Sequence, residues 1–169
     1  VYQGMVLTRL GKPNQGISRM RQAMKDLVAM ESRLVMPFWL AFMAEAHGML
    51  GESERGLQLI ADAMKLVNES GECVNESLIH RVKGDLLLAS CAGNDAEAEQ
   101  CFREAIDVAR RQKAKSYELA AVTSLARLWQ RQGRKEEARQ LLGQIYGWFT
   151  EGFDTRDLKE AKTLLDELS

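Results

Sequence analysis

The sequence predicts an all-α fold, in which four antiparallel helical hairpins form a superhelical array that ends in one further helix. Three observations predict it: glycine recurs at a period of about 40 residues, a small residue follows each of these glycines, and the 169 residues contain only two prolines. Because proline interrupts helices, its scarcity favours long ones. No strand-like alternation or Pro/Ser/Gly-rich linker interrupts the pattern, so residues 1–169 are expected to form a single domain.

The repeat is defined by glycines 40, 42 and 40 residues apart, each followed five positions later by glycine or alanine. The pairs are Gly11 with Gly16, Gly51 with Gly56, Gly93 with Ala98, and Gly133 with Ala138. A fixed period of this length is typical of repeat architectures, in which each unit buries its apolar face against its neighbours. We therefore expect repeats at about 1–33, 34–73, 74–115 and 116–149, followed by a cap at 150–169.

Each repeat is expected to hold two helices, one on either side of its glycine. Nine residues after the glycine stands a large apolar residue, and three positions further on a second apolar residue shares its helical face. These pairs are Met20 with Ala23, Ile60 with Ala63, Phe102 with Ala105, and Leu142 with Ile145. A small residue also precedes each glycine, at Gly4, Ala44, Gly84 and Ala126. Glycine tolerates the left-handed backbone of a tight turn, which lets the two helices fold into a hairpin.

The pattern places helices at 2–11, 14–31, 36–50, 53–69, 76–90, 95–112, 116–132, 135–147 and 155–167. Asn14, Ser53 and Asn94 are expected to cap the second helix of their hairpins, since a side-chain oxygen there can accept from a free backbone amide. Aromatic side chains near the C-terminal end are expected to pin the last helix across the open end of the array. These are Trp148, Phe149 and Phe153.

Composition argues against several partners. Twenty-three basic and 24 acidic residues give a net charge of −1, which supplies no overall field for nucleic acid or an anionic membrane. The basic cluster at 110–115 falls at a predicted helix end, where cations complement the helix dipole. The longest apolar run, 34–44, is well short of the ~20 residues that span a bilayer. We expect neither nucleic acid nor a membrane as partner.

Three cysteines, an odd number without CxxC spacing, predict reduced thiols and a cytoplasmic location. They are Cys73, Cys91 and Cys101. Because the sequence begins at Val1 without a basic leader, we expect it to be a piece of a larger protein.

No catalytic or metal-binding motif emerges. His47 and His80 are the only histidines, HExxH is absent, and Glu45 lies on a different helical face from His47. His47 occupies a core-side position of its repeat and is interpreted as a packed structural residue. The cysteines and His80 fit no usual zinc spacing, and no glycine-rich phosphate loop is present. We expect no enzymatic activity, cofactor or metal.

The second repeat resembles the tetratricopeptide (TPR) pattern through its small and large residues. These are Ala44, His47, Gly56, Ile60 and Ala63. The period of about 40 exceeds the usual ~34 and the closing proline is absent, which places the chain among TPR-like variants.

Over nearly its full length the chain also resembles the C-terminal repeat region of bacterial multidomain proteins. Those proteins carry an adenylate/guanylate cyclase or DNA-binding domain, then a signal-transduction ATPase, then the repeats. The resemblance rests on residues 76–88 and 96–102 and, most specifically, on WFTEGFDT at 148–155. It implies a sensing or scaffolding arm that controls the domains upstream.

Two hypotheses for function follow. The first is a regulatory or protein-interaction module that binds a peptide, a partner protein or a neighbouring domain, including the upstream part of its own polypeptide, in the groove formed by the first helices. The alternative is an architectural spacer or a self-association arm with no ligand in the groove, and in the second case the chain would form a homodimer. The sequence names neither the partner nor the signal.

The TPR resemblance implies that residues one, four and five positions after the small residue of each first helix face the groove. Arg81 joins them because it lies one turn before Asp85. The predicted groove residues are Met5, Arg9, Glu45, Met49, Arg81, Asp85, Arg127, Gln130 and Arg131. The groove is thus expected to be acidic in its middle and basic at its C-terminal end, which suits a peptide carrying both charges. In the alternative, these charges pair with each other across neighbouring helices.

Overall fold

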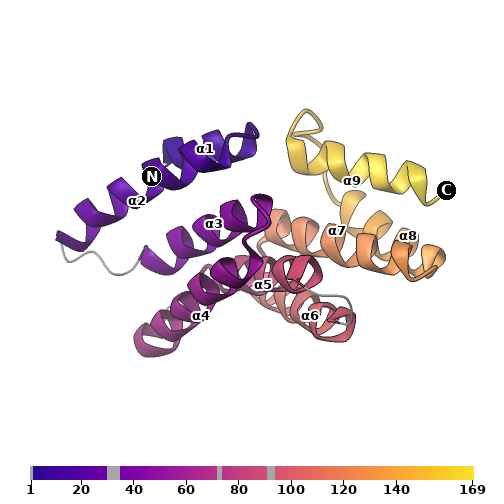
Figure 1. Cartoon of the computed structure of the whole chain (residues 1–169). Coiled ribbons are helices and arrows are strands. Elements are labelled where there is room, and N and C mark those ends of the chain that lie inside the picture. Colours follow the sequence, from indigo (N-terminus) through magenta and orange to yellow (C-terminus); the bar gives the residue numbers. More distant parts are fainter. Residues whose placement is uncertain (1, 30–34, 72–73, 91–93) are drawn as a thin grey trace.

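The computed structural model describes residues 2–29, 35–71, 74–90 and 94–169, and within them the chain forms nine α-helices and no strand (Figure 1). The helices are α1 (Tyr2–Arg9), α2 (Pro13–Ala29), α3 (Met36–Met49), α4 (Ser53–Ser70), α5 (Glu76–Ser90), α6 (Asp95–Arg111), α7 (Lys115–Arg131), α8 (Lys135–Tyr146) and α9 (Arg156–Glu167). Each begins and ends within two residues of its predicted position. The all-α fold is confirmed.

Consecutive helices pair into four hairpins that follow a curved path from α1 and α2 to α7 and α8 (Figure 1). The first helices also contact one another along the array, α3 with α5 and α5 with α7, and the second helix of each hairpin packs on the first helix of the next. The last helix, α9, contacts α7 and α8. This arrangement places one helix of every hairpin on the same side of the superhelix.

The hairpin turns use glycine as the repeat predicts. Gly11, Gly51 and Gly133 have φ angles of 76°, 77° and 78°, in the left-handed region that other residues rarely adopt. Gly93, the fourth turn glycine, lies outside the described residues. Within a hairpin the two backbones come close, since a Cβ atom on Gly56 would lie only 3.0 Å from the carbonyl oxygen of Ala44.

The core is formed by the apolar positions of the repeat. Met20, Ile60, Phe102 and Leu142 are each at most 1% exposed, as their shared register predicts. Buried residues of α2 to α5 form one cluster and those of α5 to α9 a second. Leu57 packs against both. The hairpins therefore stack through continuous apolar contacts.

The predicted helix caps are wrong. Asn14 lies inside α2, and Ser53 is the first residue of α4, where its buried hydroxyl has no hydrogen-bond partner in the described chain. Asn94 does precede α6, but its side chain donates to the carbonyl oxygen of Leu87, 3.3 Å away, and caps no amide of α6. The Asn94 side-chain NH2 thus donates to a free carbonyl at the end of α5, and in this orientation its Oδ1 accepts from no backbone amide of α6.

The C-terminal aromatic residues cover less of the end of the array than predicted. Phe149 packs against the core, and the ring centroid of Phe153 lies 5.8 Å from that of Tyr146 at the end of α8, but Trp148 and Phe153 remain 58% and 46% exposed. The open end of the array is covered instead by apolar side chains of α9 and its last turn. These are Leu158, Ala161, Leu164 and Leu168, each at most 5% exposed. The cap is therefore an amphipathic helix that buries its own apolar face.

Candidate binding groove

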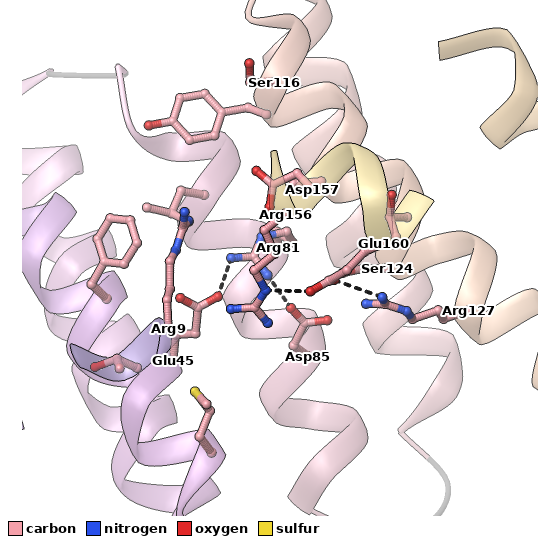
Figure 2. A pocket seen from close by; sticks show the side chains of 17 residues that line it. Arg9, Glu45, Arg81, Asp85, Ser116, Ser124, Arg127, Arg156, Asp157 and Glu160 are labelled. Atoms are coloured by element: carbon pink, nitrogen blue, oxygen red, sulfur yellow. Dashed lines mark hydrogen bonds and ion pairs between the residues drawn. The ribbon is translucent and has the colours of Figure 1, made fainter. Parts of the chain in front are cut away.

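A cavity of about 330 Å³ opens between the first helices of all four hairpins and α9 (Figure 2). Its walls come from α1, α3, α5, α7 and the first two turns of α9. Small and hydroxylated residues of α7 leave the space open. They are Ser116, Ala120, Thr123 and Ser124. Because helices separated by more than 100 residues in sequence line one cavity, the superhelical curvature itself creates the site.

The centre of the groove holds an ion triad around Arg81. Its guanidinium donates to Glu45 Oε1 on α3 and to Asp85 Oδ2 on α5, both at 2.7 Å. The Arg81 side chain is only 14% exposed. Although burial opposes the charge of Arg81, the two carboxylates raise the pKa of its guanidinium. Burial raises the pKa of Asp85 above its ordinary value, against the opposing effects of Arg81 and the Ser124 hydroxyl.

A second ion triad joins the fourth hairpin to α9. Arg127 Nη2 lies 2.9 Å from Glu160 Oε2, and Arg156 Nε lies 2.6 Å from Glu160 Oε1 (Figure 2). Burial alone would raise the pKa of Glu160, but the hydrogen bonds and charges of the two arginines lower it. When all groups are ionised, the Arg81 triad carries one surplus negative charge and the Glu160 triad one surplus positive charge.

Two further groove charges have no ion-pair partner among the described residues. Arg9 on α1 lies over the ring of Phe42, with 5.9 Å between its Cζ and the ring centroid. Asp157 stands in the first turn of α9, where its negative charge complements the helix dipole. Both line the cavity, so both are available to a bound molecule.

The structure brings six of the nine predicted groove residues together. Those that line the cavity are Arg9, Glu45, Met49, Arg81, Asp85 and Arg127. Met5 is instead half-buried and packs against the core of α2 to α5. Gln130 and Arg131 lie in a separate depression between α7 and α9. The alternative of mutual pairing holds for Arg81 with Glu45 and Asp85, whereas Arg127 pairs with α9.

The sequence interpretation missed the contribution of α9, whose Arg156, Asp157 and Glu160 reach the cavity. This helix stands outside the repeat, so no register assigned its polar residues to the groove. For the α7 wall of the cavity the sequence did carry a signal. Small, hydroxylated and charged residues recur there at helical spacing on one face, at Ser116, Ala120, Thr123 and Arg127.

The histidines and cysteines offer few candidates for a catalytic or metal-binding site. His47 is 3% exposed, and its Nδ1 lies 2.5 Å from Glu52 Oε2. His80 Nδ1 lies 3.0 Å from Glu104 Oε2. Burial raises the pKa of the Cys101 thiol. The other two cysteines, Cys73 and Cys91, lie outside the described residues.

In the described part of the chain, no cluster of three His, Cys, Asp or Glu side chains could hold a metal. None of its helices is long and apolar enough to cross a bilayer.

Comparison with known proteins supports the repeat architecture. Residues 119–145, in the fourth hairpin, match the tetratricopeptide repeat family. No curated protein matches the chain in sequence. Two crystal structures of nearly identical TPR-like repeats from a kinesin light chain-like protein of Podosopora anserina, one of them a single-substitution variant, are similar in fold. Each has 15% sequence identity and a TM-score of 0.66, over 99% of this chain and 82% of the other.

Proposed function

We propose that this TPR-like repeat region is a regulatory or protein-binding module that holds a peptide, a partner protein or a neighbouring domain in its concave groove. TPR repeats generally mediate protein–protein interactions. The observation that carries the proposal is the cavity itself, which receives side chains from all four hairpins and from α9. A segment laid along it would contact every hairpin, so one ligand would draw on the whole array.

The charges of the groove favour a partner that carries both signs. The surplus negative charge of the Arg81 triad suits a lysine or arginine of the partner, and the surplus positive charge of the Glu160 triad suits an aspartate or glutamate. Arg9 and Asp157 add one free charge of each sign. Met49, which is half exposed, adds an adaptable apolar contact.

We place this module in a cytoplasmic bacterial signal-transduction protein, where it would regulate an upstream cyclase or DNA-binding domain together with its ATPase. The support is the resemblance at 148–155 and across the third repeat. The upstream part of the same polypeptide is therefore the first partner to test.

A second candidate function is self-association through α1. Tyr2, Val6 and Leu10 follow one another at four-residue spacing and are 71%, 56% and 68% exposed. The positions equivalent to Val6 in later hairpins hold Leu86 and Leu128, which are 2% and 0% exposed because the preceding hairpin covers them. This face would accept another hairpin of the same kind. Sedimentation of wild type and Val6→Glu at several concentrations tests it, since only the wild type should dimerise.

Groove binding can be tested by selecting random 12-residue peptides displayed on phage against the immobilised chain. Selected peptides are then measured against Arg9→Gln/Asp157→Asn, which removes the two free groove charges, and against Ala120→Trp, which fills the cavity. Charge reversal at Glu45 and Asp85 is less suitable, because it would place the buried Arg81 between two other cations and strain the fold. We expect both variants to lose at least tenfold in affinity.

The matched control is Arg19→Gln/Asp107→Asn, which removes one charge of each sign from exposed positions outside the cavity. It should bind the selected peptides as the wild type does. Peptides that bind the groove variants and the control equally well would place the ligand site elsewhere.

A further inference from the structure

The charges of this chain are unevenly distributed. Residues 1–25 contain five of the 23 basic residues and none of the 24 acidic ones, although the whole chain has a net charge of −1. The basic residues are Arg9, Lys12, Arg19, Arg21 and Lys25. Counting Asp26, Glu31 and Arg33 as well, the first repeat (1–33) has a net charge of +4, whereas residues 34–169 have a net charge of −5. Such asymmetry within one chain points to an anionic partner.

Part of this basic surface lines a second groove, apart from the concave cavity, between α2 and the turn that joins α3 to α4. Its volume is about 410 Å³. One face of α2 contributes Asn14, Ser18, Gln22 and the cations Arg21 and Lys25. Arg55 faces them from α4, and Ile17 and Leu50 add apolar surface. The groove thus presents three cations, several neutral hydrogen-bonding groups and an apolar strip.

Among the side chains that the structure describes, which exclude those of residues 26–34, the three cations of this groove have no ion-pair partner, unlike Arg81, Arg127 or Arg134. Arg21 and Lys25 lie one helical turn apart, where like charges destabilise a helix. The only carboxylate in the lining belongs to Glu52, and His47 engages it at 2.5 Å. The buried Nε2 of His47 has no partner among the described residues. The groove therefore holds uncompensated positive charge that the fold does not use.

We propose that the groove between α2 and the α3–α4 turn is a binding site for an acidic protein segment, in which aspartate or glutamate side chains contact Arg21, Lys25 and Arg55. The apolar strip suits a segment that alternates acidic and aliphatic residues. A nucleic acid is disfavoured, because no Phe, Tyr or Trp side chain lines the groove for base stacking and three cations are few for a phosphate backbone.

The test uses a fluorescein-labelled 12-residue peptide of alternating glutamate and alanine, with binding followed by fluorescence anisotropy at two salt concentrations. The wild-type chain should bind it saturably and more weakly at the higher salt. Arg21→Gln/Lys25→Gln/Arg55→Gln should weaken binding at least tenfold. Lys12→Gln/Arg19→Gln/Lys135→Gln, which removes the same net charge outside the groove, should stay within twofold of the wild type.

A variant that gains affinity separates binding from misfolding. Glu52→Gln removes the one negative charge of the groove and should tighten peptide binding severalfold. Unchanged or weaker binding by Glu52→Gln, or equal losses in the two triple variants, would overturn the proposal. Tighter binding of a 12-nucleotide oligothymidylate through the same three cations would also overturn it and would identify a nucleic-acid site. Complete competition by millimolar inorganic phosphate would overturn it as well and would identify a simple ion site.

Discussion

The ring of Phe102 on α6 occupies the space that any side chain at Gly84 on α5 would need. A Cβ atom on Gly84 would lie 2.5 Å from Cε1 of that ring. Phe102 is fully buried and cannot withdraw without moving the surrounding core. Glycine at this position therefore sets the distance between the two helices of the third hairpin.

We predict that Gly84→Ala destabilises the protein. Overpacking of this kind costs roughly 1 to 3 kcal/mol, against a gain in helix propensity of at most about 1 kcal/mol. Urea denaturation measures the net loss. Gly143→Ala is the control, because its Cβ would meet nothing within 4 Å in α8, and the same propensity gain should leave it equal to or more stable than the wild type. Equal stability of the two variants would contradict the close approach.

We predict that Ala98→Leu is destabilising, since Ala98 is completely buried where α6 meets its neighbours. The expected loss is roughly 1 to 3 kcal/mol, seen as a lower thermal midpoint. Ala96→Leu adds the same side chain at an exposed position of α6 and should leave the midpoint nearly unchanged. If Ala98→Leu had the same thermal midpoint as the wild type, the helix crossing would have enough space for a larger side chain.

We predict a pH-dependent role for Glu118, which joins the end of α6 to the start of α7. Its carboxylate accepts from Arg110 at 2.8 Å and from Lys115 at 2.7 Å. Burial would raise the pKa of Glu118, but these bonds and charges lower it below the ordinary 4.5. Because the folded chain then holds this proton less tightly than the unfolded chain does, the stabilisation is present at neutral pH and is lost as pH falls below about 4.5.

Glu118→Gln should therefore cost roughly 1 to 3 kcal/mol at pH 7, the range for hydrogen bonds to a charged group, and much less near pH 3. Urea denaturation at both pH values measures the difference. Glu136→Gln, at an exposed pair with Arg139, is the control and should leave the unfolding midpoint at pH 7 unchanged. A cost for Glu118→Gln that is the same at both pH values would assign its effect to packing.

We predict that α9 and not the aromatic residues before it stabilises the end of the array. Leu164→Ala should cost roughly 2 to 5 kcal/mol, because Leu164 is 3% exposed and its loss leaves a cavity between α9 and the fourth hairpin. Trp148→Ala should cost much less, since that side chain is 58% exposed. Thermal unfolding of both variants shows which substitution is more destabilising. A larger loss of stability for Trp148→Ala would support a cap formed by the aromatic residues.

The repeat register made the fold predictable. The period of about 40 correctly places the glycines of three described turns. It also places buried large residues such as Phe102 and Leu142. These features depend on local backbone geometry and on one helical face, both of which leave a pattern in sequence. Helix capping was not predictable in the same way, because Asn94 could serve either the end of α5 or the start of α6.

The groove was predictable only in part. Residues of the first helices, such as Glu45 and Arg127, could be assigned because the TPR resemblance implies which positions of the repeat face the groove. The position of Glu160 depends on how α9 packs on α7 and α8, which no repeated unit specifies. The ion-pair partner of Arg127 is thus a product of tertiary packing between segments 33 residues apart.

The excess positive charge of the first hairpin has a consequence for encounters in solution. With cations gathered on the first hairpin of a curved array and an acidic excess over the rest, the molecule has an electric dipole moment that its net charge of −1 conceals. A charged partner arriving by diffusion would be rotated by this field before any contact forms. Association rates should therefore fall with ionic strength far more steeply than for a uniformly charged chain of the same net charge.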